Sequence, residues 1–566
     1  MAPTVLLAAD GKALAAVLVP PDADRVTRFA ARELARYLQQ ISGARFRVRE
    51  ATAPVAGQPA LLVGAGPWTA DLTDAPAPEP GGRDSFTLLT RDGKVYLWGN
   101  RSRATLYAVY AFLEALGCEF IEPNVEHIPG SLRLAAPELS RRETAGFALR
   151  NIFRNMVVAG HHEPFSFLNP DLHLPQIDWM AKRRLNHYEF YIDFYRYDLW
   201  EKHKHQVLDA LLDRGFDLEV THHSLHYFCP PDENHDFGGY GPSTYQRNHP
   251  NWYEPAYECG SRGRWQTNVG IPAVQEVVFE RYLDYVARNP ELKIIGLWPD
   301  DVPMNAPYKG LSRTDGYVKF WNKLAKLMAK QHPDKRLGII AYFELIEPPA
   351  QVEPLPNTHL WYCPIERNYM QPVSYPANRS FARNLQGWIN QMAPGHLASF
   401  EYWGWAAPMT PHRVYMATDL PRYQEMGSGG IYGWAGFTYN LLGKDYGWAI
   451  DMFALSRLLW EPQADLTALE QQWARGVFGP AAGPVLDFYE IIKAGHAQEA
   501  AQGLLPSYEW ISANLFHRAQ KPLATARKKT DDPRLVRRID QLEKRAALQF
   551  TEEVWHKRPP VKYVGM

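Results

Sequence analysis

The sequence predicts an α/β protein: a (β/α)8 barrel with a small N-terminal α/β domain before it and a helical region after it. Three observations support this. The chain has 566 residues, more than the roughly 250–300 at which a single hydrophobic core stops growing. From Phe147 onward, apolar runs alternate eight times with helical patterns, which is typical of buried parallel strands covered by helices. An early G-x-G-x-x-G turn, the mark of an open dinucleotide-binding sheet, is absent from the sequence.

The predicted N-terminal domain covers residues 1–142. Apolar runs predict its strands at 14–19, 60–63, 85–89 and 95–98. Arg91-Asp92-Gly93 indicates a hairpin turn between the last two strands. Amphipathic patterns predict helices at 24–41 and 103–116, and Gly117 is the expected stop of the second helix. The segment 123–142 is rich in proline and polar residues, and we interpret it as a linker.

The predicted barrel covers residues 143–450, and a helical C-terminal region covers 451–566. Eight apolar runs predict the barrel strands, near 148–154, 186–192, 217–222, 293–299, 337–343, 358–364, 397–403 and 429–435. A long insertion runs from His223 to about Ala273 and is rich in glycine, proline, tyrosine and tryptophan, which suits a loop over a substrate cleft. Helical patterns follow near 466–476, 484–501 and 532–551.

Composition narrows the class of function. The net charge of −1 argues against a nucleic-acid or polyanion binder, and no apolar run approaches the ~18 residues of a membrane span. We therefore expect neither nucleic acid nor membrane as a partner. The first residues do not resemble a signal peptide, so the expected compartment is cytoplasmic, or periplasmic or secreted if a leader was removed. The abundant aromatic residues suit a large core, and they also suit the stacking of sugar rings. On the second interpretation, carbohydrate is the expected partner.

The sharpest local signal is Trp298-Pro299-Asp300-Asp301, at the end of the fourth barrel strand. Side chains at these strand ends point into the active site of such barrels. Two adjacent carboxylates differ in direction and surroundings, so one can stay ionised while the other, near Trp298, holds a proton. Glycoside cleavage needs such an acid and a second charge near the anomeric carbon. Alternatively, the pair merely caps the next helix or turn.

Glu344 and Glu401 are competing catalytic candidates, because each ends a strongly apolar strand. A fourth-strand acid with a seventh-strand nucleophile is a common retaining arrangement, and Glu401 lies beside several aromatic residues. The alternative for each carboxylate is a salt bridge to a barrel arginine such as Arg154 or Arg367. The remaining residues expected to line a sugar site are Arg154, Trp298, Tyr342, Trp403, Trp405, Trp434 and Asn440.

His222, His223 and His226 follow the third barrel strand. Side chains alternate along a strand, so His222 and His223 are expected to point in opposite directions. The chain has no H-E-x-x-H helix and no C-x-x-C pair among its four cysteines. We therefore expect no metal and no cofactor, and we expect these histidines to hydrogen-bond substrate hydroxyls or an acetamide.

Several of these segments resemble known carbohydrate-active enzymes. The segment 101–114 and the following Leu116-Gly117-Cys118 resemble the end of the N-terminal domain shared by α-glucuronidases and β-hexosaminidases. The segments 222–228 and 249–253, with Asp301 and 458–462, resemble the barrel of glycoside hydrolase family 163. The resemblance covers most of residues 1–490.

This resemblance implies endo-β-N-acetylglucosaminidase activity on N-glycans, assisted by the substrate acetamide. Asp301 would be the general acid/base and Asp300 the residue that polarises the acetamide. Members of the family more often have Asn-Asp-Gly where this chain has Asp300-Asp301-Val302, so the sugar is left open. Two other functions also stay open: an α-glucuronidase-like inverting hydrolase in which Arg262 or Arg264 binds a uronate, and a non-catalytic glycan-binding protein.

Overall fold

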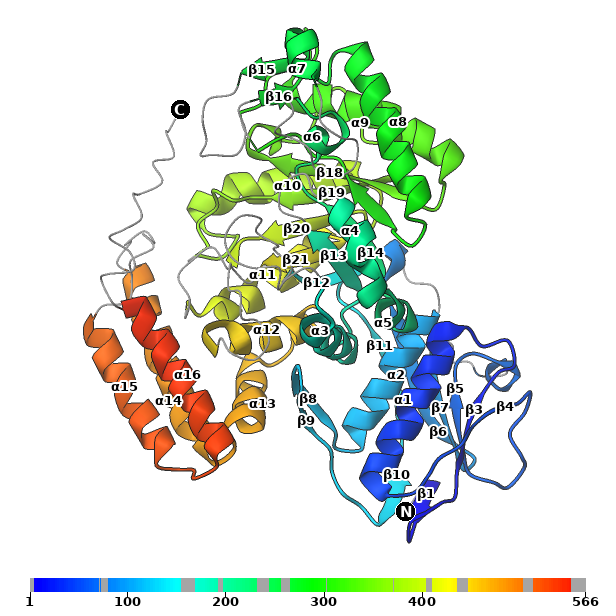
Figure 1. Ribbon diagram of the computed structural model, residues 1–566. Coiled ribbons are helices and arrows are strands. Elements are labelled where there is room, and N and C mark those ends of the chain that lie inside the picture. Colours follow the sequence, from blue (N-terminus) through cyan, green and yellow to red (C-terminus); the bar gives the residue numbers. More distant parts are fainter. Residues whose placement is uncertain are drawn as a thin grey trace.

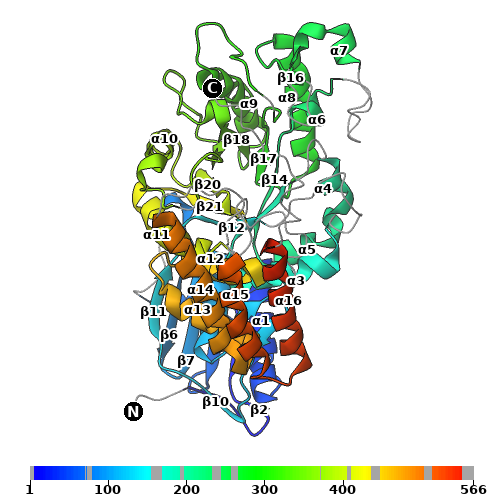
Figure 2. The same ribbon diagram turned by 90° about the vertical axis from the view of Figure 1, so that its left-hand side faces the viewer.

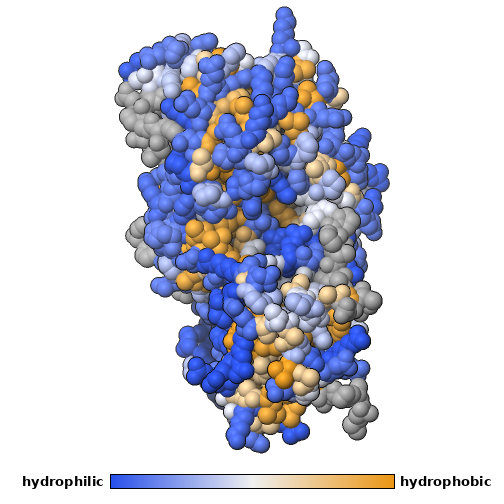
Figure 3. All heavy atoms as spheres, turned by 90° about the vertical axis from the view of Figure 1, so that its right-hand side faces the viewer, coloured by the Kyte–Doolittle hydropathy of each residue, from blue (hydrophilic) through white to orange (hydrophobic). Residues whose placement is uncertain are grey.

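A computed structural model gives the structure of the chain. It describes residues 5–70, 72, 80–153, 168–191, 197–231, 244–255, 265–301, 303–369, 371–403, 410–434, 446–501 and 513–550. The N-terminal domain lies beneath the barrel, and the C-terminal helices stand beside both (Figures 1 and 2). One long face of the molecule is largely hydrophilic with separate hydrophobic patches (Figure 3), a mixture that is ordinary for folded proteins. No helix within the described ranges is long and apolar enough to span a membrane.

The N-terminal domain is built on a six-stranded mixed sheet in the order β11-β6-β7-β5-β3-β4. Its strands are β3 (Ala16–Val19), β4 (Val48–Glu50), β5 (Ala60–Val63), β6 (Ser85–Arg91), β7 (Lys94–Gly99) and β11 (Ser140–Thr144). Its helices are α1 (Arg25–Ser42) and α2 (Ser102–Ala115). The smaller strands are β1 (Val5–Ala9), β2 (Lys12–Ala13), β8 (Glu119–Glu122), β9 (Val125–His127) and β10 (Arg133–Ala136). The predicted hairpin and both predicted helices are confirmed.

The interpretation of residues 123–142 as a linker is wrong. This segment contains β9, β10 and the start of β11, all of which pair within the N-terminal sheets. β11 has the sequence Ser-Arg-Arg-Glu-Thr and is mostly exposed. It is an edge strand, held by backbone hydrogen bonds to β6, and an edge strand needs no apolar alternation. The hydrophobic pattern therefore gave no signal for it.

The predicted barrel is confirmed. Eight parallel strands form one sheet in the order β12-β21-β20-β19-β18-β17-β14-β13. Their bounds are β12 (Leu149–Phe153), β13 (His187–Tyr191), β14 (Asp217–Thr221), β17 (Ile294–Gly296), β18 (Arg336–Tyr342), β19 (Thr358–Cys363), β20 (Leu397–Glu401) and β21 (Gly430–Trp434). The backbone N–H of Asn186 donates to the carbonyl of Arg150 at 3.2 Å, which links β13 to β12 and brings the two ends of the sheet together.

Helices surround the barrel and continue into the C-terminal region. The helices between the barrel strands are α3 (Pro170–Lys182), α4 (Asp198–His203), α5 (Leu208–Asp213), α8 (Pro272–Arg288), α9 (Arg313–Gln331), α10 (Arg379–Gln391) and α11 (His412–Met426). After the last strand come α12 (Tyr446–Leu458), α13 (Leu466–Phe478), α14 (Ala482–Ala501), α15 (Ala513–Arg527) and α16 (Pro533–Phe550). The insertion carries α6 (Leu225–Phe228), α7 (Tyr245–Asn248), β15 (Tyr253–Pro255) and β16 (Trp265–Thr267), above the barrel in Figure 1.

The interior of the barrel holds a buried polar cluster beneath the strand ends. Glu219 on β14 is fully buried and accepts hydrogen bonds from Trp361 Nε1 at 2.8 Å and from the Tyr432 hydroxyl at 2.5 Å. His187 Nε2 lies 2.8 Å from the same carboxylate. These three partners come from three other strands and are themselves buried. The buried carboxylate is therefore satisfied by groups inside the barrel.

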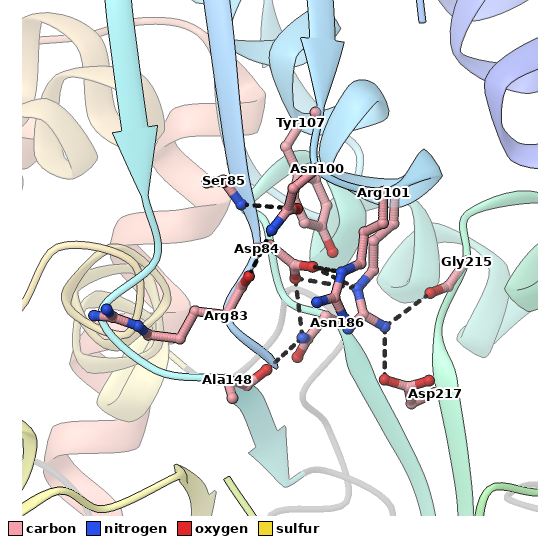
Figure 4. Close-up of polar contacts among 12 residues, drawn as sticks. Arg83, Asp84, Ser85, Asn100, Arg101, Tyr107, Ala148, Asn186, Gly215 and Asp217 are labelled. Atoms are coloured by element: carbon pink, nitrogen blue, oxygen red, sulfur yellow. Dashed lines mark hydrogen bonds and ion pairs between the residues drawn. The ribbon is translucent and has the colours of Figure 1, made fainter. Parts of the chain in front are cut away.

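Asp84, just before β6, joins the N-terminal domain to the barrel (Figure 4). Its fully buried carboxylate receives Arg103 Nε at 2.9 Å and Arg150 Nη2 at 2.6 Å. Arg103 also reaches Asp217, at the start of β14, at 2.6 Å. Burial raises the pKa of Asp84, but Arg103, Arg150 and Arg101 outweigh it and lower the pKa from 3.8 to about 2. One ionised carboxylate thus pairs with an arginine from each of the two domains.

We expect Asp84→Asn to destabilise the protein by about 3–5 kcal/mol at neutral pH, because it removes the anion that pairs with the fully buried Arg150. The folded-state pKa is below the ordinary value, so the stabilisation is present above about pH 4 and is lost as pH falls toward 2. Urea unfolding midpoints of both proteins between pH 7 and pH 3 provide the measurement. Equal midpoints at pH 7 would contradict the assigned role.

Candidate active site

The candidate active site lies at the carboxyl ends of the barrel strands, away from the N-terminal domain. His223 and Trp298, which follow β14 and β17, form an isolated parallel bridge that extends the pairing of the strands beyond their last regular residues. Tyr342, the last residue of β18, lies next to them, with its ring centroid 6.0 Å from that of His223. Parallel strands that end at one rim bring these side chains together, as the sequence predicted.

Asp300 is held by the insertion. Its side chain is fully buried, and Oδ2 lies 3.0 Å from Nε2 of His226 on α6. The hydroxyl of Thr267 on β16 donates to the same oxygen at 3.2 Å. Gln266 bonds both backbone groups of Asp300, each at 3.3 Å. Among the described residues no donor reaches Oδ1, which is also buried.

Asp301 has the opposite environment. Its side chain is 37% exposed, whereas that of Asp300 is not exposed at all. His223 Nδ1 lies 2.5 Å from the carbonyl oxygen of Pro299. A carbonyl oxygen can only accept, so Nδ1 carries a proton and donates it. The other nitrogen, Nε2, lies 3.8 Å from Asp301 Oδ1, so a protonated imidazole would attract this carboxylate without a direct hydrogen bond.

Glu344 belongs to the same rim. It lies in the short 3-10 turn Phe343–Leu345, directly after β18, and is partly exposed. The backbone of Phe343 has a φ of 44°, a left-handed conformation that costs a non-glycine residue energy and is often found at functional sites. No hydrogen bond or ion pair of Glu344 is formed within the described ranges.

Glu401, by contrast, lies in a buried ion-pair network. Its two oxygens accept hydrogen bonds from Arg367 Nη1 at 2.9 Å, Ser399 Oγ at 2.6 Å and the Tyr423 hydroxyl at 2.7 Å. Arg367 also pairs with the buried Asp419. Burial raises the pKa of Glu401, although Arg367 opposes this shift. This geometry matches the alternative expected from the sequence, a salt bridge between Glu401 and Arg367.

The other predicted site residues divide into two groups. Trp298, His222 and Trp403 are described and almost completely buried. Trp298 packs edge-on against Trp361 with ring centroids 5.0 Å apart. Arg154, Trp405 and Asn440, the side chain of Trp434, and the alternative uronate ligands Arg262 and Arg264 lie outside the described residues.

Sequence reasoning missed Thr267 and Gln266, which hold Asp300. They lie on a three-residue strand inside the insertion, too short for alternation to reveal. The described residues contain no cluster of histidine, cysteine or acidic side chains arranged to hold a metal ion. The two adjacent carboxylates differ in exposure: that of Asp301 is partly accessible, and that of Asp300 is buried.

The chain was compared with models of protein families and with curated proteins. A family model described as "Domain of unknown function (DUF4838)" matches residues 120–490, which include the whole barrel. No curated protein matches the chain.

Among solved structures, a family GH115 4-O-methyl-α-glucuronidase with specificity for decorated arabinogalactans is similar over 96% of this chain and 72% of its own, at 13% identity and a TM-score of 0.60. A GH138 enzyme targeting pectin rhamnogalacturonan II covers 94% of this chain and 85% of its own, at 9% identity and a TM-score of 0.58. Streptomyces plicatus N-acetyl-β-hexosaminidase covers 84% and 92%, at 13% identity and a TM-score of 0.50. At such identities the likeness shows a shared fold.

Proposed function

The chain belongs to the DUF4838 family, and on that premise we propose that it is a retaining glycoside hydrolase that cleaves a β-linked N-acetylglucosamine-containing glycan. The nucleophile is the acetamide carbonyl oxygen of the substrate. The observation that carries the proposal is the pair Asp300 and Asp301, one fully buried and one 37% exposed. The resemblance to glycoside hydrolase family 163 and its endo action on N-glycans remain part of this proposal.

In the first step, Asp301 donates a proton to the glycosidic oxygen while the acetamide carbonyl oxygen attacks the anomeric carbon. The bond to the leaving group breaks, and a cyclic oxazolinium forms within the sugar. In the second step, Asp301 removes a proton from water, which attacks the anomeric carbon and reopens the ring. Two inversions at one carbon give overall retention, and the same residue serves as acid and then as base.

The environment of Asp300 suits the role of polarising the acetamide. Its Oδ2 is held by His226 and Thr267, so the direction of the carboxylate is set before a substrate arrives. The buried Oδ1 is left to accept the acetamide N–H, whose positive charge grows as the ring closes. A preorganised, buried carboxylate stabilises that charge more in the transition state than in the ground state.

His223 suits a role as a positioning residue for Asp301. Its ring is fixed by the Pro299 carbonyl, and its other nitrogen faces the Asp301 carboxylate. Glu401, which is already paired with Arg367, fits a structural role better than that of a nucleophile. This supports substrate assistance over a nucleophile from the seventh strand.

The comparisons support the glycosidase class through the fold alone. One similar structure is named as an N-acetyl-β-hexosaminidase and another as an α-glucuronidase. The similarity to an α-glucuronidase favours one alternative, an inverting α-glucuronidase-like reaction. That reaction needs an acid and a base on different strands with a water between them, and the partly exposed Glu344 is the described carboxylate that suits the base.

A substrate series tests the proposal, after a mass-spectrometric screen against N-glycans, chitobiosides and aryl glycosides has found a cleavable glycan. Aryl β-glycosides of glucosamine that carry N-acetyl, N-fluoroacetyl, N-difluoroacetyl or N-trifluoroacetyl groups differ chiefly in the nucleophilicity of the amide oxygen. Across the series kcat/KM is expected to fall by about 100-fold or more, which corresponds to about 2.7 kcal/mol in the barrier. A flat series, or cleavage of an aryl uronoside but of no acetamido sugar, would overturn the proposal.

A further inference from the structure

A pocket lies at the end of the barrel opposite the candidate active site, between the N-terminal domain and the starts of the barrel strands. Its volume is about 250 Å³. That is well above the ~30 Å³ share of one water molecule and just below the roughly 300–1,000 Å³ of drug-sized ligand sites. β18 has seven residues, so this pocket is roughly 20 Å from the candidate active site at about 3.3 Å per residue. The charged residues that line it are Arg101, Arg103, Lys293, Arg336, Asp217 and Asp334.

Most of these charges are already paired. Arg103 lies 2.9 Å from Asp84 and 2.6 Å from Asp217, and Arg101 lies 3.3 Å from Asp84. Figure 4 shows Arg101 beside Asp84, with Asp217 below them. Lys293 lies 3.7 Å from Asp334, at the solvent-exposed side of the pocket. The carboxylates are thus engaged by neighbouring cations.

Arg336 is the exception. It opens β18 and is only partly exposed, and within the described ranges its side chain makes no hydrogen bond or ion pair. Burial lowers the pKa of Arg336, and the charge of Asp217 offsets this only in part. A partly buried guanidinium without a partner is costly. Its five donors in a planar fork match the oxygens of a phosphate or a carboxylate.

We propose that this pocket, which we call the basal pocket, binds a small oxyanion between Arg336 of the barrel and Arg101 of the N-terminal domain. Arg101 is the residue before α2 and is 38% exposed. The positive end of the helix dipole therefore adds to the attraction. A bound oxyanion would join the two domains and stabilise their contact. This inference does not rest on the proposed function, because none of its residues belongs to the candidate active site.

Calorimetric titration with inorganic phosphate at constant ionic strength, balanced with chloride, tests the basal pocket. Wild-type protein is expected to bind phosphate saturably with a Kd of about 1 mM or tighter. At ten times the Kd, Tm is expected to rise by about 1–3 °C. Parallel titrations with sulfate and with D-glucuronate distinguish a phosphate-like ligand from the carboxylate of a sugar acid, and saturable binding of either kind supports the site.

Arg336→Gln is expected to weaken phosphate binding at least 10-fold. In phosphate-free buffer it should be no less stable than wild type, because it removes an unpaired charge. Arg422→Gln is the matched control: Arg422 lies on α11, pairs with Glu425 at 3.0 Å and is 58% exposed, so its loss should leave phosphate binding unchanged. An absence of saturable binding, or equal binding by wild type and Arg336→Gln, would overturn the proposal.

Discussion

Asp301→Asn is expected to lower kcat by about 10²–10⁴-fold, the usual contribution of a general acid/base, while the protein stays folded. Asparagine keeps the size of the side chain but can neither donate a proton to the leaving oxygen nor remove one from water. The side chain is 37% exposed, and within the described part of the chain its one polar contact is the long one to His223, at 3.8 Å. Few interactions are lost, so the unfolding temperature should change little.

The leaving group provides a sharper test of the role of Asp301. A 2,4-dinitrophenyl leaving group departs without protonation, so the first step no longer needs the acid. For such a substrate the loss in kcat/KM should be much smaller than for a natural glycan, because kcat/KM reports the first step when that step is irreversible. If the loss is the same for both substrates, Asp301 does not act as the acid.

Glu344→Gln and Glu401→Gln are the matched carboxylate controls. Glu344→Gln should retain kcat within about 10-fold of wild type, since the proposal gives Glu344 no proton to transfer. Glu401→Gln should reduce stability by about 3–5 kcal/mol, because Arg367 loses a buried partner. A larger catalytic loss at either glutamate than at Asp301 would favour a reaction with acid and base, or nucleophile, on separate strands.

The sequence predicted the architecture well because eight buried parallel strands leave a strong apolar signal. Each predicted barrel strand overlaps an observed one, and β5 (Ala60–Val63) has the predicted bounds. The edge strand β11 was missed, since its pairing uses the backbone and its side chains are polar. Apolar patterning locates strands that bury side chains, and it does not detect strands that are held only by main-chain bonds.

The candidate site was predictable only in part. The rule that function lies at strand ends gave Asp300 and Asp301 as candidates, and the adjacency of β14, β17 and β18 brings His223 near Asp301 and Tyr342 near His223. The role of Glu401 needed coordinates, because the choice between a nucleophile and an ion pair depends on where Arg367 lies. The same is true of Thr267, which reaches Asp300 from 33 residues earlier in the chain. Contacts between an insertion and a strand end have no local sequence pattern.

Asp300→Asn is expected to lower kcat by about 10²–10³-fold with little change in KM, because the carboxylate acts on charge that appears only in the transition state. Thr267→Val removes one hydrogen bond to Oδ2, at 3.2 Å. It should cost about 10-fold or less, since one such bond contributes roughly 0.5–1.5 kcal/mol. Thr267→Ser keeps the hydroxyl and is the matched control, with activity close to that of wild type.

The fluoroacetyl series separates this role of Asp300 from a purely structural one. If Asp300 stabilises positive charge on the amide nitrogen, its removal should change the dependence of kcat/KM on the amide substituent, whereas a general loosening of the site would lower every substrate alike. Thr267→Val should shift that dependence in the same direction and by less, because it weakens the hold on the same carboxylate. A parallel loss across all four substrates in Asp300→Asn, or a loss confined to KM, would show that the buried carboxylate only maintains the shape of the site.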